Sequence, residues 1–146
     1  MPRAGETLYR GQCHCGAVAL RFYTRTPAAE LALRACQCGF CRKHGARTTA
    51  DPEGRAEIVV PDPTAVERYR FALGTADYFV CRRCGVYLGA VMTEAGRGWS
   101  VLNINAFDDA AAFGQPPAPM VYDHEDEAGR RARRRKLWTP TAVVAG

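Results

Sequence analysis

The sequence has almost no serine and no long apolar segment. Ser100 is its only serine and lies outside a Gly-x-Ser-x-Gly motif, which argues against a serine hydrolase. No run approaches the about eighteen apolar residues that a membrane-spanning helix needs. Residues 1–10 contain no apolar core of a secretory signal. We therefore expect a cytoplasmic location and no membrane partner.

Lysine is also scarce, and the positive charge is concentrated near one end. The chain has 146 residues, a formal net charge of +5 and twenty basic residues, of which six lie in 130–136. Without that run the chain is close to neutral, so the basic character is local and does not indicate a nucleic-acid surface across the fold. We interpret the run as a solvated helix face that follows the acidic stretch 123–127, and nucleic acid is not an expected partner.

Seven cysteines fall into three clusters whose spacing predicts metal binding. The clusters are Cys13 and Cys15, then Cys36, Cys38 and Cys41, then Cys81 and Cys84. An odd number of cysteines in a chain expected in the cytoplasm argues against a disulfide framework. Two cysteines one or two residues apart can bind one zinc ion if the backbone turns tightly, and Gly16 and Gly85 can supply the positive φ of such a turn.

The cysteines divide into a complete and an incomplete set of zinc ligands. Two pairs end in Cys-Gly and together supply the four thiolates of a structural zinc site: Cys13, Cys15, Cys81 and Cys84. The remaining three, Cys36, Cys38 and Cys41, would leave a tetrahedral zinc ion one ligand short, as in catalytic sites. We therefore expect two Zn²⁺ ions per chain, and the second has an open position.

Three alternatives for the three-cysteine cluster stay open. His44 follows Cys41 by three residues and could be a fourth ligand, for which His14 and His124 are weaker candidates. The cluster could instead consist of free thiols, with zinc only in the four-cysteine site. It could also contain a redox-active pair, although the βαβ pattern typical of such motifs is missing.

Short alternating segments separated by turns predict a mainly β fold with little helix. We expect strands over 17–23, 31–35, 55–60, 66–71, 76–80, 86–92 and 99–107. One helical turn over 39–44 and a helix over 126–138 complete the prediction. Aromatic residues such as Tyr78 and Tyr87 are expected in the core, although any of them could line a cleft beside the second zinc.

The order of these motifs resembles the glutathione-dependent formaldehyde-activating enzymes, which share a domain with centromere protein V. The resemblance lies in Gly11-Gln-Cys13-His-Cys15-Gly16, Cys36-x-Cys38-x-x-Cys41-x-Lys43 and Cys81-x-x-Cys84-Gly85. It implies the β-tent fold, in which twisted antiparallel β-sheets are organised around zinc. We expect this zinc-binding domain to cover 1–115, with a proline-rich connector and basic C-terminal tail over 116–146 packed on the same domain.

The resemblance also implies an activity, which is that of a carbon–sulfur lyase forming or cleaving S-hydroxymethylglutathione. The expected substrates are glutathione or another small thiol and formaldehyde or a related aldehyde. A thiol bound at the open position would become a thiolate and add to the aldehyde, with His44 as a proton carrier. Arg34, Arg42 and Arg47 could pair with carboxylates of a glutathione-like tripeptide. The alternative function is a zinc-stabilised, non-catalytic module that binds a protein or nucleic acid.

Overall fold

The computed structural model describes residues 1–146 and shows a single twisted sheet of eleven strands with little helix. The strands are β1 (Thr7–Gln12), β2 (Ala19–Thr24), β3 (Leu33–Cys36), β4 (Thr48–Thr49), β5 (Arg55–Val59), β6 (Val66–Tyr69), β7 (Asp77–Cys81), β8 (Tyr87–Glu94), β9 (Arg97–Asn103), β10 (Ala118–Met120) and β11 (Thr139–Val144). The helices are α1 (Gly39–His44), α2 (Glu127–Leu137) and four short 3₁₀ helices, η1 (Ala28–Glu30), η2 (Pro63–Ala65), η3 (Ile104–Ala106) and η4 (Ala110–Phe113). The prediction of a mainly β fold is confirmed. Neither α-helix has the length and apolar character needed to cross a membrane.

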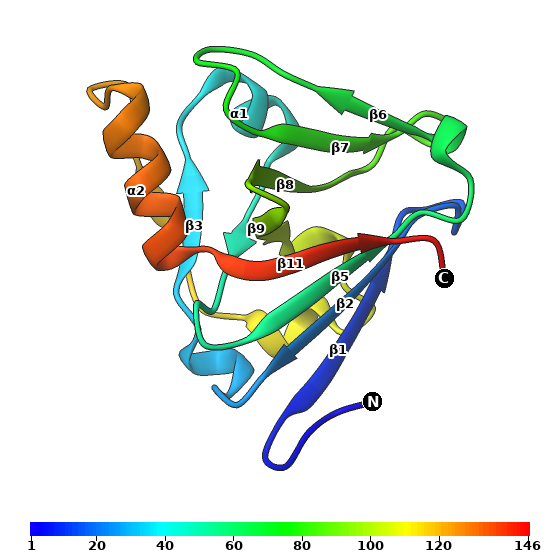
Figure 1. Ribbon diagram of the computed structural model, residues 1–146. Helices are drawn as coiled ribbons and strands as arrows, with labels where there is room; N and C mark the ends of the chain where they lie inside the picture. Colours follow the sequence, from blue (N-terminus) through cyan, green and yellow to red (C-terminus); the bar gives the residue numbers. More distant parts are fainter.

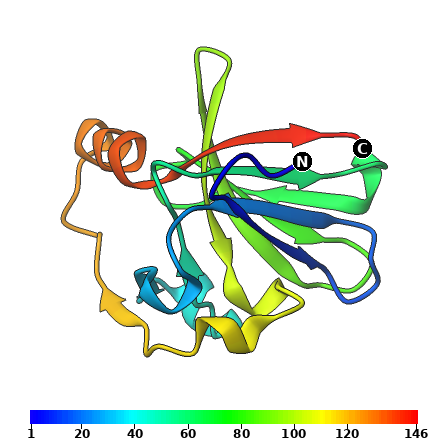
Figure 2. The ribbon, with the colours of Figure 1, turned by 90° about the horizontal axis from the view of Figure 1, so that it is seen from below.

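The sheet branches at β9. A lower arm continues from β9 through β11, β5 and β2 to β1, and an upper arm continues through β8 and β7 to β6 (Figure 1). A third branch leads from β9 through β4 and β3 to β10. All neighbouring strands are antiparallel except the pairs β11–β5 and β10–β3. Figure 2 shows the strands fanning out from one side of the molecule, so the two arms form the walls of a wedge.

The main hydrophobic core fills the space between the two arms. Leu20, Phe22 and Ile58 come from the lower arm, Phe79 and Leu88 come from the upper arm, and all five are almost completely buried. Burying one side chain of this size contributes about 1.5–3 kcal/mol to folding. The alternating apolar residues in β2, β5 and β7 therefore hold the arms together from within.

Strands β8 and β9 are buried on both faces, which explains the nearly continuous apolar run of β8. Leu88 belongs to the main core, whereas Met92 belongs to a second cluster that also contains Trp99 and Trp138. Trp138 directly follows α2. Its burial therefore anchors the C-terminal end of the helix against the outer face of these two strands.

Several strands lie outside the predicted segments. The sequence-based prediction contains no counterpart of β1, β4, β10 or β11. Strands β4 and β10 are too short to show an alternating pattern of apolar residues, and β11 contains Pro140, which is unfavourable within a sheet. The strand expected over 99–107 ends at Asn103, whose side chain accepts a hydrogen bond from the N–H of Asn105 and caps η3. The two predicted helices form almost where they were expected.

Two candidate metal centres and the adjoining cavity

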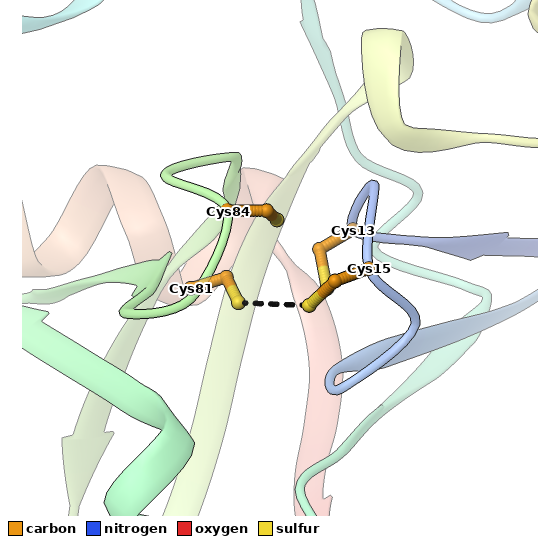
Figure 3. Close-up of side chains that lie close together, drawn as sticks. All are labelled: Cys13, Cys15, Cys81 and Cys84. Carbon is orange, nitrogen blue, oxygen red and sulfur yellow. Dashed lines mark hydrogen bonds between the residues drawn. The ribbon is translucent and has the colours of Figure 1, made fainter.

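Four cysteines from two turns form the first candidate metal centre (Figure 3). Cys13 and Cys15 lie between β1 and β2, Cys81 ends β7, and Cys84 lies in the turn before β8. The Sγ atom of Cys15 is 3.7 Å from that of Cys13 and 3.6 Å from that of Cys81. Zinc–sulfur bonds of about 2.3 Å at tetrahedral angles require sulfur atoms about 3.8 Å apart. The four-cysteine centre therefore fits a zinc ion.

Each turn of the four-cysteine centre contains a glycine with positive φ and is closed by a backbone hydrogen bond to its first cysteine. Gly16 and Gly85 have φ angles of +82° and +80°, the conformation for which glycine is favoured. The N–H of Gly16 donates to the carbonyl of Cys13 over 3.1 Å, and the N–H of Gly85 donates to the carbonyl of Cys81 over 2.9 Å. Further backbone N–H groups of each turn donate to the Sγ atoms of Cys13 and Cys81 over 3.4 Å.

The four-cysteine centre joins the two arms of the sheet. Cys13 belongs to the lower arm and Cys81 to the upper arm, and both are only 1% exposed and form part of the main core. Cys15 and Cys81 are 66 residues apart in the sequence. A metal ion here would close a long loop and hold the open edge of the wedge together.

Three cysteines from β3 and α1 form the second candidate metal centre. Cys36 ends β3, Cys38 is the N-cap of α1, and the buried Cys41 lies in its first turn. The Sγ atom of Cys38 accepts a hydrogen bond from the N–H of Cys41 over 3.4 Å. All three sulfur atoms lie within 4.8 Å of one another. The helical turn predicted over 39–44 is thus confirmed, and it brings the three sulfur atoms close together.

The chemistry of the three-cysteine centre also suits a cation. Hydrogen bonding from Cys41, together with the backbone N–H of Cys38, lowers the pKa of Cys36 to about 5. The pKa of Cys41 is raised in return by its hydrogen bond with Cys36 and by burial. One of the three sulfur atoms is therefore a thiolate at neutral pH, and a divalent cation would favour ionisation of the others.

His44 is not a member of either group of potential metal ligands. It ends α1, its side chain is exposed, and its ring centroid is 4.5 Å from that of Phe40 and 5.6 Å from that of Tyr87. His14 and His124 are also exposed and lie outside both groups. The three-cysteine centre therefore has no histidine among the side chains grouped around it.

A cavity opens beside the three-cysteine centre. It has a volume of about 170 Å³, its lining includes Cys36 and Cys38, and a neighbouring cavity of about 50 Å³ reaches Cys41. Tyr78 and Tyr87 form part of the walls, and burial raises the pKa of both phenols, so both remain protonated. These tyrosines are packed as expected for core residues, yet they also face the candidate site.

Helix α2 closes the cavity and does not present the solvated basic face that we predicted. Arg134 is only 5% exposed, and Arg130 and Arg133 pair with Glu125 over 3.2 and 2.7 Å. Two further arginines of the helix pair with Glu94 of β8. The solvated-face interpretation is therefore wrong for the inner side of α2.

The sequence contained a signal for this inner face. Positions 130, 133, 134 and 137 follow the i, i+3, i+4, i+7 spacing of one helix side, and Leu137 is the apolar member. Arg133 and Arg134, from this face, line both cavities. The prediction of a solvated face used only the charge of residues 130–136 and not their helical spacing.

The three arginines predicted to meet a substrate carboxylate have different environments. Arg34 lines the smaller cavity. Arg42 is exposed on α1, and the guanidinium of Arg47 donates to the side-chain oxygen of Asn105 over 3.1 Å. Of the three, Arg34 is therefore the one placed beside the three-cysteine centre.

Comparisons with known proteins agree with the geometry. Residues 8–124 match the sequence model of a family described as glutathione-dependent formaldehyde-activating enzyme. A crystal structure of a Rhodobacter sphaeroides protein is similar, with a TM-score of 0.57 and 25% identity, and the match covers 77% of this chain and 99% of that chain. No curated protein matches this chain. The family match contains all seven cysteines and ends before α2.

Proposed function

We propose, from the premise that the chain belongs to the glutathione-dependent formaldehyde-activating enzyme family, that it is a zinc-dependent carbon–sulfur lyase. Its substrates would be glutathione or another small thiol and formaldehyde or a related aldehyde. In the forward direction the sulfur bonds to the carbonyl carbon, and the thiol proton ends on the carbonyl oxygen. In the reverse direction the carbon–sulfur bond breaks and both molecules are released.

The observation that carries this proposal is an incomplete set of ligands beside a cavity. Cys36, Cys38 and Cys41 bring three sulfur atoms together, and Cys36 and Cys38 also line the larger cavity. A zinc ion bound there would leave one coordination position for a substrate thiol, which it would stabilise as a thiolate.

The surrounding side chains supply the polar groups that the reaction needs. The hydroxyl of Tyr87 is buried without a hydrogen-bond partner and remains protonated, so it can donate to the oxygen of the aldehyde. His44, which is exposed, is the proposed group for exchanging protons with solvent. The buried aromatic walls would exclude water from the reacting atoms.

We assign the structural zinc to Cys13, Cys15, Cys81 and Cys84, so a fully metallated chain would contain two ions. Elemental analysis of the wild type and of Cys38→Ala tests this division. We expect two zinc ions per chain in the wild type and one in the variant, with an unchanged circular dichroism spectrum. Cys15→Ala is the matched control at the other centre. It should unfold the protein, because it removes one of the four proposed zinc ligands that join the two arms.

A cobalt-substituted protein tests the open position directly. Addition of a thiol should change the visible absorption of cobalt in the wild type, because a fourth sulfur enters the coordination sphere. The change should be absent in Cys38→Ala. A single ion in fully metallated wild type, or a cobalt spectrum that no thiol alters, would contradict the lyase proposal and favour a non-catalytic binding module.

A further inference from the structure

We infer that the two neighbouring cavities beside the three-cysteine centre bind a small mercapto acid, whose carboxylate is held in the smaller one by the guanidinium groups of Arg34 and Arg134. This inference rests on the proposed function, because it concerns the thiol that would enter the same site. It replaces a tripeptide thiol with a compact one, whose carboxylate lies close to its sulfur.

Arg134 is a buried cation with no acidic partner. It is 5% exposed, its Nη1 donates to the hydroxyl of Thr75 over 2.7 Å, and its Cζ lies 4.5 Å from the ring centroid of Trp138. Its Nε is buried and has no hydrogen-bond partner. Burial lowers the pKa of Arg134 to about 10, so the group remains charged at neutral pH. A buried charge of this kind is costly unless an anion accompanies it.

Arg34 provides a second cation without an acidic partner, and it is next to a metal ligand. It lies two positions before Cys36 on β3, so both side chains are on one face of the strand, about 6.6 Å apart along it. The Nη1 atom of Arg34 is buried and has no hydrogen-bond partner. Arg34 and Arg134 line the same cavity and take part in none of the ion pairs of the protein.

The other charges around the cavity are balanced or lie at its edge. Arg130 and Arg133 share the carboxylate of Glu125, and Asp123 lines the larger cavity from an exposed position. Three thiolates on a divalent metal ion carry one net negative charge, which offsets one of the two remaining guanidinium groups. The resting site therefore keeps positive charge and free N–H donors for an anion from the substrate.

The size of the cavity determines which anion fits. The cavity that both arginines line has a volume of about 50 Å³, and the neighbouring cavity lined by Cys36, Cys38 and Arg134 has a volume of about 170 Å³. Each is below the about 300 Å³ at which pockets for drug-sized ligands begin. The short step from Cys36 to Arg34 favours a carboxylate one or two carbons from the sulfur. In glutathione both carboxylates are separated from the sulfur by peptide bonds, and a compact mercapto acid satisfies the geometry better.

The segment that supplies Arg134 lies outside the part of the chain that matches the family. The match ends at residue 124, whereas α2 covers Glu127–Leu137. The seven cysteines are thus in the matched region, and one of the two proposed carboxylate contacts is not. Specificity would be set by the C-terminal helix, and metal binding by the matched domain.

Binding of two matched probes to the cobalt-loaded protein tests the inference. Mercaptopropionate and mercaptopropanol have the same length and differ in one terminal group, a carboxylate or a hydroxyl. We expect mercaptopropionate to bind about ten- to a hundredfold more tightly, because hydrogen bonds to a charged group contribute about 1.5–3 kcal/mol. Arg34→Gln and Arg134→Gln should each remove most of this preference, measured as the ratio of the two affinities within one variant.

The control and the contrary outcomes separate this inference from the proposed function. Arg135→Gln, on the exposed side of the same helix, should keep the full preference. Equal affinities in the wild type would overturn the inference and leave the lyase proposal intact. A preference that survives both substitutions would mean that the carboxylate binds the metal, and would also overturn it. A cobalt spectrum indifferent to both thiols would overturn the lyase proposal and the inference with it.

Discussion

The four-cysteine and three-cysteine centres both consist of cysteine sulfur atoms, but the first is enclosed by two turns and the second is open to a cavity. In the first, two similar turns enclose four sulfur atoms, and backbone N–H groups donate to two of them. In the second, one strand end and one short helix present three sulfur atoms to a cavity lined by tyrosines and arginines. The first cluster is thus enclosed by protein, whereas the second is open to a cavity in which a further ligand could bind.

The two centres also differ in what they connect. The four-cysteine centre joins the turn after β1 to the turn after β7 (Figure 3), and Cys13 and Cys81 are part of the main core. The three-cysteine centre lies beside a cavity whose lining includes three arginines of α2, and Trp138 packs the end of that helix against the sheet. Loss of the first should therefore damage the fold, and loss of the second should damage the chemistry.

The largest effect is expected from Cys81→Ser, which removes a buried ligand of the four-cysteine centre. We expect a loss of about 5 kcal/mol or more in the free energy of unfolding, because metal binding at such sites contributes directly to folding. Thermal unfolding followed by circular dichroism measures this. Cys38→Ser is the matched substitution at the three-cysteine centre. Equal losses of unfolding free energy in the two variants would contradict the proposed difference between the two centres.

The next largest effect is expected from Trp138→Ala, which tests the dependence of the cavity on helix packing. Truncation of a buried tryptophan costs about 3–5 kcal/mol, and here it would also release the end of α2 from the sheet. Thiol affinity of the cobalt-loaded protein should fall while the chain keeps two metal ions. A variant that loses metal together with thiol affinity would show that the three-cysteine centre itself needs the helix.

Cys38→Ser should reduce turnover of a thiol–aldehyde adduct by about a hundredfold or more, equivalent to about 2.7 kcal/mol of activation free energy. The reason is the loss of one of three ligands beside the cavity. Initial rates of formaldehyde release measure it. Arg42→Gln, an exposed change on α1, should leave the rate within a factor of two, and a similar loss there would point to damage of the whole helix.

The smallest effect is expected from Glu125→Gln, which removes the carboxylate that holds Arg133 and Arg130. Arg133 lowers the pKa of the Glu125 carboxyl, so the ion pair stabilises the fold above the unfolded-state value and is lost as pH falls through the lowered one. We expect a destabilisation of about 1 kcal/mol at neutral pH that shrinks in acid, measured by urea unfolding at several pH values. A difference that stays constant with pH would exclude the ion pair as its cause.

The sequence predicted the local conformation of the cysteine-containing segments well for a physical reason. Cys38, Cys41 and the capping residues of α1 lie within a few positions of one another, so their geometry follows from one helical turn. The turns at Gly16 and Gly85 are local in the same sense. The strands β4 and β11 were missed, because their pairing partners lie far away in the sequence and their own residues show no period.

The cavity could not be predicted, because it is made by three distant segments. The sequence leaves Tyr87 open as a core residue or as part of a cleft wall, and it predicts Arg134 on a solvated helix face, because neither interpretation includes contacts with distant elements. In the structure the buried hydroxyl of Tyr87 and the buried guanidinium of Arg134 line one cavity with Cys36. Contacts of this kind depend on how α2 packs against β8 and β9.

The amino-acid sequence by itself determined the number, spacing and division of the seven cysteines and the mainly β character of the chain. These properties depend on neighbours along the chain and on residue type. Tertiary structure alone decided that the basic helix covers the three-cysteine centre and that two of its surrounding arginines lack an acidic partner. That arrangement follows from burial of Trp138 against a sheet whose strands come from distant parts of the sequence.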